Sequence, residues 1–146
     1  MTPPREPIAV IGTGYVGLVT AAGFAELGNE VWCVDIDADK IARLERGEVP
    51  IYEPGLAESI AANRERLRFS TELAPALEQA RLLFVAVGTP PTYSGDADLS
   101  AVHAVVDAIP ASDAHAHAHR APDDRHRRVA AAPPFALRRC LSRLVG

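Results

Sequence analysis

The sequence is poor in cysteine, in aromatic residues and in long apolar runs, and each shortage excludes a class of protein. Two cysteines, Cys33 and Cys140, are too few for a disulfide framework and lack the spacing of a metal site. No apolar run reaches the length of about 18 residues that crosses a bilayer, so we expect no membrane contact. Residues 1–7 lack the basic region and cleavage site of a signal peptide. These absences predict a cytoplasmic protein with one modest core.

Charge divides the chain into two unlike parts. Residues 1–110 carry 8 Lys and Arg against 16 Asp and Glu, whereas residues 111–146 carry 7 Arg against 3 Asp. This reversal indicates that the second part is a different kind of sequence from the first. A basic tail could bind nucleic acid, but aromatic residues interleaved with the arginines are lacking. We therefore expect no nucleic-acid partner.

What the chain does contain is a glycine-rich turn between two apolar segments. The apolar stretch Ile8 to Ile11 runs into Gly12-Thr13-Gly14-Tyr15-Val16-Gly17, and an apolar helical pattern follows. In this G-x-G-x-x-G spacing, Gly12 permits a tight turn, Gly14 lets backbone approach a pyrophosphate, and Gly17 lets the helix pack near the strand. The N–H groups that begin the helix would face the phosphates. The pattern predicts a dinucleotide-binding turn, and a purely structural glycine turn is the alternative.

An acidic residue at the end of the next strand favours the dinucleotide interpretation. The stretch Glu30 to Val34 ends in Asp35, close to the spacing of about 20 residues at which an acid binds the adenosine ribose. A structural turn does not explain this acid. Its carboxylate would repel a ribose 2′-phosphate, and no arginine follows immediately to receive one. The expected cofactor is therefore NAD rather than NADP.

Strand and helix patterns alternate from residue 8 to residue 109. Residues 82–87 form the most apolar run, which is typical of a strand buried on both faces of a parallel sheet. Further strands are expected at 8–11, 30–34 and 67–70, with helices after the glycine turn, Asp37 or Asp39, Pro54, Thr71, and Asp98 or Ser100. The fold class is therefore α/β: an incomplete Rossmann-like parallel sheet with flanking helices, extended by a fourth strand and a further helix.

The residues that follow the strands are the candidates for binding. Ligands of open parallel sheets lie beyond the carboxyl ends of the strands, where Gly12, Asp35 and Thr89 are expected to converge. The Thr89 hydroxyl either bonds a ribose or phosphate oxygen or satisfies turn backbone. Lys40 either approaches the adenosine end beside Asp35 or is a solvated surface lysine. Glu53, in a loop broken by prolines, is either a substrate group or solvated.

Four segments together resemble the N-terminal domain of the UDP-glucose/GDP-mannose dehydrogenase family. They occur in order at compatible spacings, and the resemblance covers about residues 7–110. The Tyr-Glu-Pro-Gly-Leu loop is far more specific than the glycine turn. The segments are Gly12 to Leu18, Asp35 to Asp37 with Lys40 and Ile41, Gly47 with Pro50 to Leu56, and Val87 to Pro90.

The resemblance implies oxidation of the C6 alcohol of UDP-glucose to the carboxylate of UDP-glucuronate, with two NAD molecules used in successive hydride transfers. The family's catalytic cysteine, lysine and asparagine have no match here, so we expect no catalytic residue and no activity from this chain alone. A non-catalytic remnant that at most binds NAD is one alternative, and GDP-mannose or UDP-N-acetylmannosamine is the alternative substrate. The family's dimerising helix has no match either, which makes a homodimer doubtful. The implied NAD contacts are Gly12, Gly14, Tyr15, Val16, Gly17, Asp35, Lys40 and Thr89.

The family pattern ends abruptly before the basic segment. We therefore divide the chain into a partial dinucleotide-binding domain over 1–110 and an Arg/Ala/His-rich tail over 111–146, disordered or translated out of frame. The His-x-His-x-His run at 115–119 would share one face of a strand and could bind metal. The restricted composition of the tail favours the interpretation without a metal. Cys140, between arginines and leucine, matches no catalytic motif.

Overall fold

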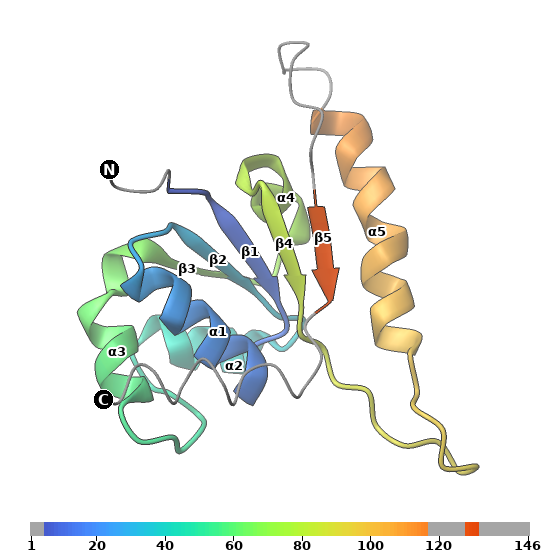
Figure 1. Ribbon diagram of the computed structural model, residues 1–146, viewed down its shortest axis with the longest axis horizontal. Coiled ribbons are helices and arrows are strands. Elements are labelled where there is room, and N and C mark those ends of the chain that lie inside the picture. Colours follow the sequence, from blue (N-terminus) through green and yellow to red (C-terminus); the bar gives the residue numbers. More distant parts are fainter. Residues whose placement is uncertain (1–4, 117–127, 132–146) are drawn as a thin grey trace.

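A computed structural model describes residues 5–116 and 128–131 of the chain. Strands and helices alternate in it, and Figure 1 shows the strands as one layer with helices around it. The elements are β1 (Ile8–Ile11), α1 (Tyr15–Glu26), β2 (Val31–Val34), α2 (Ala38–Glu45), α3 (Leu56–Ala62), the 3-10 helix η1 (Arg64–Arg66), β3 (Leu67–Ser70), α4 (Leu73–Gln79), β4 (Leu82–Val85), α5 (Ser100–Ala116) and β5 (Arg128–Ala131).

The sheet is parallel and has the strand order β3-β2-β1-β4-β5. Ile8 to Ile11 of β1 pair with Val31 to Val34 of β2 on one side and with Leu82 to Val85 of β4 on the other. The order 3-2-1-4 reverses at β1, and ligands of such sheets bind where it reverses. The predicted Rossmann-like parallel sheet with flanking helices is confirmed.

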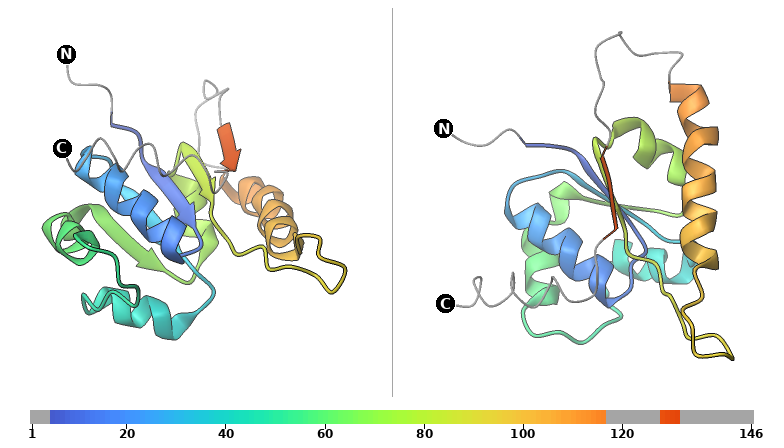
Figure 2. Two further views of the ribbon diagram at one scale, coloured as in Figure 1. Left: turned by 60° about the horizontal axis from the view of Figure 1, so that its bottom comes forward. Right: turned by 45° about the vertical axis from the view of Figure 1, so that its right-hand side comes forward.

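Side chains of β1, β2 and β4 alternate between two apolar cores. Ile8 and Val10 of β1 belong to the core that α1, α2 and α3 cover, whereas Ala9 and Ile11 belong to the core that α4 and α5 cover. The right-hand view of Figure 2 shows α1 and α5 on opposite sides of the sheet. Both faces of the sheet are therefore buried at these three strands, which is why they carry apolar residues at successive positions.

The fourth strand is shorter than expected. It ends at Val85, which pairs with Ile11 at the end of β1, and the amide of Ala86 still donates to the Ile11 carbonyl at 2.8 Å. Beyond this point β1 turns into the glycine loop, so residues 86 and 87 have no strand to pair with on that side. The shortening leaves Val87 to line the cleft described below.

The last helix is longer than expected. We expected it to reach Ile109, but α5 continues to Ala116, into the segment assigned to the tail. Pro110 removes one helical N–H donor, and the alanines that follow it favour helix. The backbone of Arg128–Ala131 forms β5 beside β4, also within that segment. The disordered or out-of-frame nature of the tail stays a prediction, since residues 117–127 and 132–146, Cys140 among them, lie outside the described residues.

Candidate dinucleotide-binding site

The turn from β1 to α1 requires glycine at two positions because other backbone lies too close. Gly12 has a φ of 99°, and a Cβ on it would lie 2.6 Å from the carbonyl oxygen of Ala86. A Cβ on Gly17 would overlap the carbonyl oxygen of Gly12. These two glycines therefore serve the folded chain itself, because they let α1 and the end of β4 pack against the turn.

Gly14 differs because no part of the described chain demands a glycine there. Its φ is −72°, and a Cβ on it would find no protein atom within 4 Å beyond its own neighbours. The helix α1 begins at this position without a side-chain cap and without an acidic residue in its first turn. The positive end of the helix dipole therefore faces open space with no carboxylate in that turn. Such a helix end fits the pyrophosphate of a dinucleotide.

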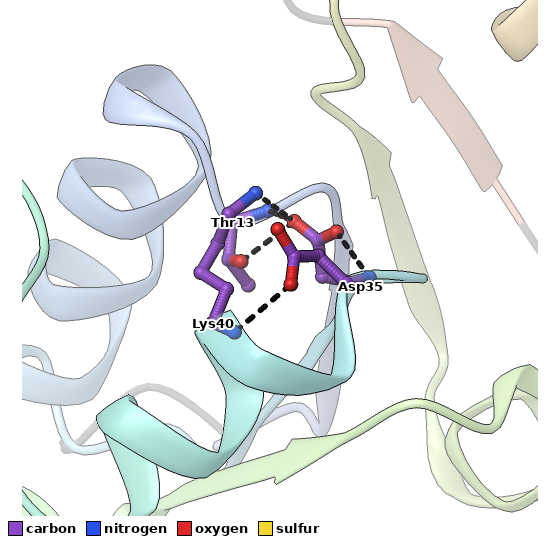
Figure 3. A network of polar contacts seen from close by, with 4 residues as sticks. Thr13, Asp35 and Lys40 are labelled. Atoms are coloured by element: carbon purple, nitrogen blue, oxygen red, sulfur yellow. Dashed lines mark hydrogen bonds and ion pairs between the residues drawn. The ribbon is translucent and has the colours of Figure 1, made fainter.

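The carboxylate of Asp35 is held at the end of β2 by four hydrogen bonds, drawn in Figure 3. Its Oδ2 accepts from the backbone N–H of Thr13 at 2.8 Å, from the Thr13 hydroxyl at 2.7 Å and from Lys40 Nζ at 2.9 Å. Its Oδ1 accepts one bond, from the backbone N–H of Asp37 at 3.1 Å. The glycine turn and the acid predicted to bind ribose are thus in direct contact.

These contacts decide the charge of Asp35. Burial by itself would raise its pKa, but the hydrogen bonds from Thr13, Lys40 and the Asp37 amide outweigh burial and lower the pKa from 3.8 to about 2. The carboxylate is therefore ionised well below neutral pH. An ionised carboxylate accepts hydrogen bonds from ribose hydroxyls and repels a 2′-phosphate, which fits NAD.

Lys40 lies beside Asp35, which favours the first of the two interpretations of this lysine. The Asp37 side chain caps α2 by accepting from the Lys40 backbone N–H at 3.0 Å, so Lys40 is in the first turn. A cation there opposes the helix dipole. The ion pair with Asp35 at 2.9 Å offsets that opposition, and the lysine side chain is only 30% exposed.

A cleft of about 450 Å³ opens beyond the ends of β1, β2 and β4. Among the predicted site residues, Gly12, Gly14, Asp35 and Lys40 line this cleft. One of its walls comes from α5, which sequence reasoning did not assign to the site. The remaining lining residues are Ile11, Val34, Ile36, Thr71, Leu73, Ala86, Val87, Gly88, Ala101, Ala104, Val105 and Ala108.

Four of the predicted NAD contacts do not line the cleft. Gly17 is buried in the turn, Val16 is half-buried, and Tyr15 and Thr89 are exposed. Thr89 directly follows the lining residue Gly88, so it lies at the rim. The contact of each predicted residue with NAD stays a prediction.

Thr13 is a polar site residue that sequence reasoning missed. It is fully buried, and among the described residues it is the sole polar side chain in the buried class. A signal was present in the sequence, since threonine is a polar residue between two glycines of the turn. Its partner Asp35 is remote in sequence, so no local pattern could reveal the contact.

Cys33 is buried in β2, and burial raises the pKa of its thiol to about 12. It is therefore a protonated, unreactive thiol at neutral pH. Within residues 5–116 and 128–131, no three His, Cys, Asp or Glu side chains are grouped to hold a metal ion. The helices of that same part include none long and apolar enough to cross a bilayer.

The site geometry agrees with the family to which the chain is similar. Residues 6–117 match the model of the UDP-glucose/GDP-mannose dehydrogenase family, NAD binding domain. The chain belongs to this family. The resemblance recognised in the sequence is confirmed, and the cofactor of this NAD-binding domain is NAD.

Individual proteins are similar to this chain in sequence and in structure. UDP-glucose 6-dehydrogenase of Pseudomonas aeruginosa is 55% identical over 105 residues, which are 70% of this chain and 23% of that protein. A UDP-glucose dehydrogenase of Pyrobaculum islandicum has a TM-score of 0.71 at 39% identity, over 75% of this chain and 26% of its own. GDP-mannose dehydrogenase of Pseudomonas aeruginosa has a TM-score of 0.68 at 36% identity, over 70% of this chain and 24% of its own. The chain thus spans about a quarter of the length of these relatives.

Proposed function

We propose that this chain supplies the NAD-binding part of a UDP-glucose 6-dehydrogenase. The observation that carries the proposal is the contact between the glycine turn and Asp35, which places a helix end suited to phosphate beside a carboxylate suited to ribose. The 55% identity to UDP-glucose 6-dehydrogenase of Pseudomonas aeruginosa supports this member of the family over the others.

Each part of the site has a separate role in the proposal. The start of α1 at Gly14 binds the pyrophosphate, and the Asp35 carboxylate binds the adenosine ribose. Lys40 keeps that carboxylate paired and offers a further donor to the ribose. Val87 and Val105 provide apolar walls that exclude water from the bound cofactor. NAD, when bound, accepts the hydride that the sugar alcohol loses on oxidation.

In the whole enzyme, the substrate would be the C6 alcohol of UDP-glucose, oxidised to the carboxylate of UDP-glucuronate with two NAD. By resemblance, the cysteine, lysine and asparagine that act on the sugar belong to a part of the family that this chain does not match. We therefore propose that the chain alone binds NAD without oxidising a sugar. GDP-mannose and UDP-N-acetylmannosamine are the alternative substrates, and a non-catalytic remnant is the alternative function.

Calorimetric titration of the full chain with NAD tests the proposal. We expect saturable binding to the unsubstituted chain and a loss of affinity of about 100-fold or more in Asp35→Ala, because the carboxylate that accepts hydrogen bonds from the ribose hydroxyls is removed. Gly14→Ala is expected to weaken binding about tenfold or more while the fold persists, because its methyl group fills the space meant for phosphate.

The control for Asp35 is Asp39→Ala, which removes the same charge from an exposed position in the first turn of α2. It should leave NAD affinity within about twofold, because a surface charge contributes little. Folding of each variant is checked by circular dichroism. Absence of NAD binding to the folded, unsubstituted chain would contradict the proposal and leave the remnant as the better description.

A further inference from the structure

The Thr13 side chain is buried, and its hydroxyl bonds the carboxylate of Asp35. It is 0% exposed, and its hydroxyl donates to Asp35 Oδ2 at 2.7 Å. Its backbone N–H donates to the same oxygen at 2.8 Å. Burying a hydroxyl costs free energy unless a strong partner accepts from it, and an ionised carboxylate is such a partner. The placement of Thr13 therefore serves the Asp35 carboxylate.

The two oxygens of that carboxylate are not equivalent. Oδ2 accepts three hydrogen bonds, which saturate it: two from Thr13 and one from Lys40. Oδ1 accepts a single bond, from the Asp37 amide. A carboxylate has about four lone-pair sites, two on each oxygen, so the remaining acceptor capacity belongs to Oδ1. Asp35 lines the cleft, where a ribose would lie.

We propose that Thr13 is a positioning residue for cofactor recognition, whose hydroxyl pins Asp35 Oδ2 so that Oδ1 alone is presented to the ribose 2′-hydroxyl. The proposal rests on the role of Asp35 proposed above. In this proposal Thr13 makes no contact with the cofactor. The threonine acts by removing the rotational freedom of a carboxylate that would otherwise exchange its two oxygens.

Thr13 suits this role better than the other two groups that bond Asp35. Lys40 has a long, flexible side chain that is 30% exposed, so its ammonium restrains the carboxylate less rigidly than a buried hydroxyl does. The Asp37 amide binds Oδ1, the oxygen that the ligand needs, and leaves Oδ2 unrestrained. The Thr13 hydroxyl alone is both buried and aimed at Oδ2, which fixes the carboxylate plane together with the backbone N–H.

The test compares NAD with 2′-deoxy-NAD, which lacks the hydroxyl that Oδ1 would bind. Both ligands are titrated calorimetrically into the full chain and into Thr13→Val, which keeps the shape of threonine and loses the hydroxyl. We expect Thr13→Val to weaken NAD about tenfold, because a charge-assisted hydrogen bond is lost from the carboxylate. Binding of 2′-deoxy-NAD should change by less than about twofold, since this ligand has no 2′-hydroxyl for the presented Oδ1 to accept from.

Thr13→Ser and Thr13→Ala form a second pair that guards against a folding defect in the valine variant. Both lack the threonine methyl group, and only serine keeps the hydroxyl. We expect Thr13→Ser to bind NAD within about threefold of the unsubstituted chain and Thr13→Ala to match the loss in Thr13→Val. This rescue would not occur if the methyl packing mattered.

Equal weakening of NAD and 2′-deoxy-NAD by the loss of the hydroxyl would overturn the inference, because it would indicate a general disturbance of the turn. So would unchanged NAD binding in Thr13→Val or Thr13→Ala. If the unsubstituted chain binds both ligands equally well, the fault lies instead with the proposed ribose contact of Asp35. The two failures are therefore distinguishable.

Discussion

The two sides of the cleft are built in different ways. On the β2 side, the Asp35 carboxylate is held by donors from the glycine turn, from α2 and from its own loop. On the β4 side, Thr89 is exposed, and the loop that follows is fastened to itself by a bridge between Pro91 and Ala97. Figure 1 shows that this loop projects away from the sheet before α5 begins.

The internal contacts of that loop make the difference clearer. The backbone N–H of Thr92 donates to the Asp96 carbonyl at 2.6 Å, and Ser94 bonds the Asp96 side chain at 3.0 Å. None of these bonds reaches the Asp35 network among the described residues. The β2 side, where we propose that ribose binds, is thus already ordered by bonds from several elements, whereas the β4 loop is bonded within itself. Preorganised groups contribute more to binding because less ordering is left to occur.

The largest expected effect comes from the turn on which the β2 side depends. Gly17→Ala should destabilise the chain by about 3 kcal/mol or more, because its Cβ would overlap the Gly12 carbonyl and push α1 from the sheet. In the same helix, the Cβ of Gly23→Ala would meet no atom within 4 Å beyond its chain neighbours and the adjacent backbone of α1. This substitution should stabilise the chain by about 0.5–1 kcal/mol through helix propensity.

Urea unfolding monitored by circular dichroism measures both changes in free energy. Similar stability of Gly17→Ala and the unsubstituted chain would show that the turn yields without cost. That result would contradict the view that the β2 side of the cleft is rigid and so differs from the loop that follows β4.

A pH series tests the electrostatic part of the comparison. Because the pKa of Asp35 is about 2 in the folded chain and 3.8 is the ordinary value, its contribution to stability is complete above about pH 4. It declines as the pH falls toward 2, where the folded carboxylate takes up its proton. Asp35→Asn lacks this contribution, so the stability difference between the two proteins should shrink over that range.

The measurement is the urea midpoint of both proteins at several pH values between about 2 and 7. Acidification affects the other carboxylates of both proteins alike, so the difference isolates Asp35. A difference that stays constant down to pH 2, or grows, would contradict the proposed network.

The smallest effect is expected on the β4 side. Thr89→Ala should weaken NAD binding by at most about fivefold, because a single neutral hydrogen bond contributes about 1 kcal/mol. Stability should change by less than about 0.5 kcal/mol, because the side chain is exposed. Thr92→Ala, within the same loop, is the control and should leave NAD affinity unchanged. A loss in Thr89→Ala as large as that in Asp35→Ala would show that the loop closes over the cofactor.

Much of the site could be predicted because its signals are local. A glycine directly after an apolar run indicates a tight turn, and an acidic residue directly after the next apolar run indicates the end of a strand. Gly12, Gly14 and Asp35 were found in this way, and they do line one cleft. Lys40 was placed beside Asp35 as one of two alternatives, because its helix position alone did not distinguish a paired lysine from a solvated one.

Other features depend on which strands are neighbours. Thr13 meets Asp35 because β1 and β2 pair in parallel with Ile11 opposite Val34, which brings the residues after both strands together. The wall formed by α5 depends on the return of that helix across the sheet face, after a loop that no local pattern describes. The continuation of α5 past Pro110 likewise reflects helix formation that a break in the family pattern had concealed.

The sequence by itself determined the order of strands and helices over residues 8–109, the glycine turn, the acid at the end of β2 and the membership of the dehydrogenase family. These follow from short-range steric and apolar patterns, which act whatever the rest of the chain does. The tertiary structure decided which oxygen of Asp35 is occupied, whether Lys40 lies beside Asp35 or in solvent, and which helix forms a wall of the cleft. Those are contacts between residues far apart in sequence, and only the register of a folded sheet sets their distances.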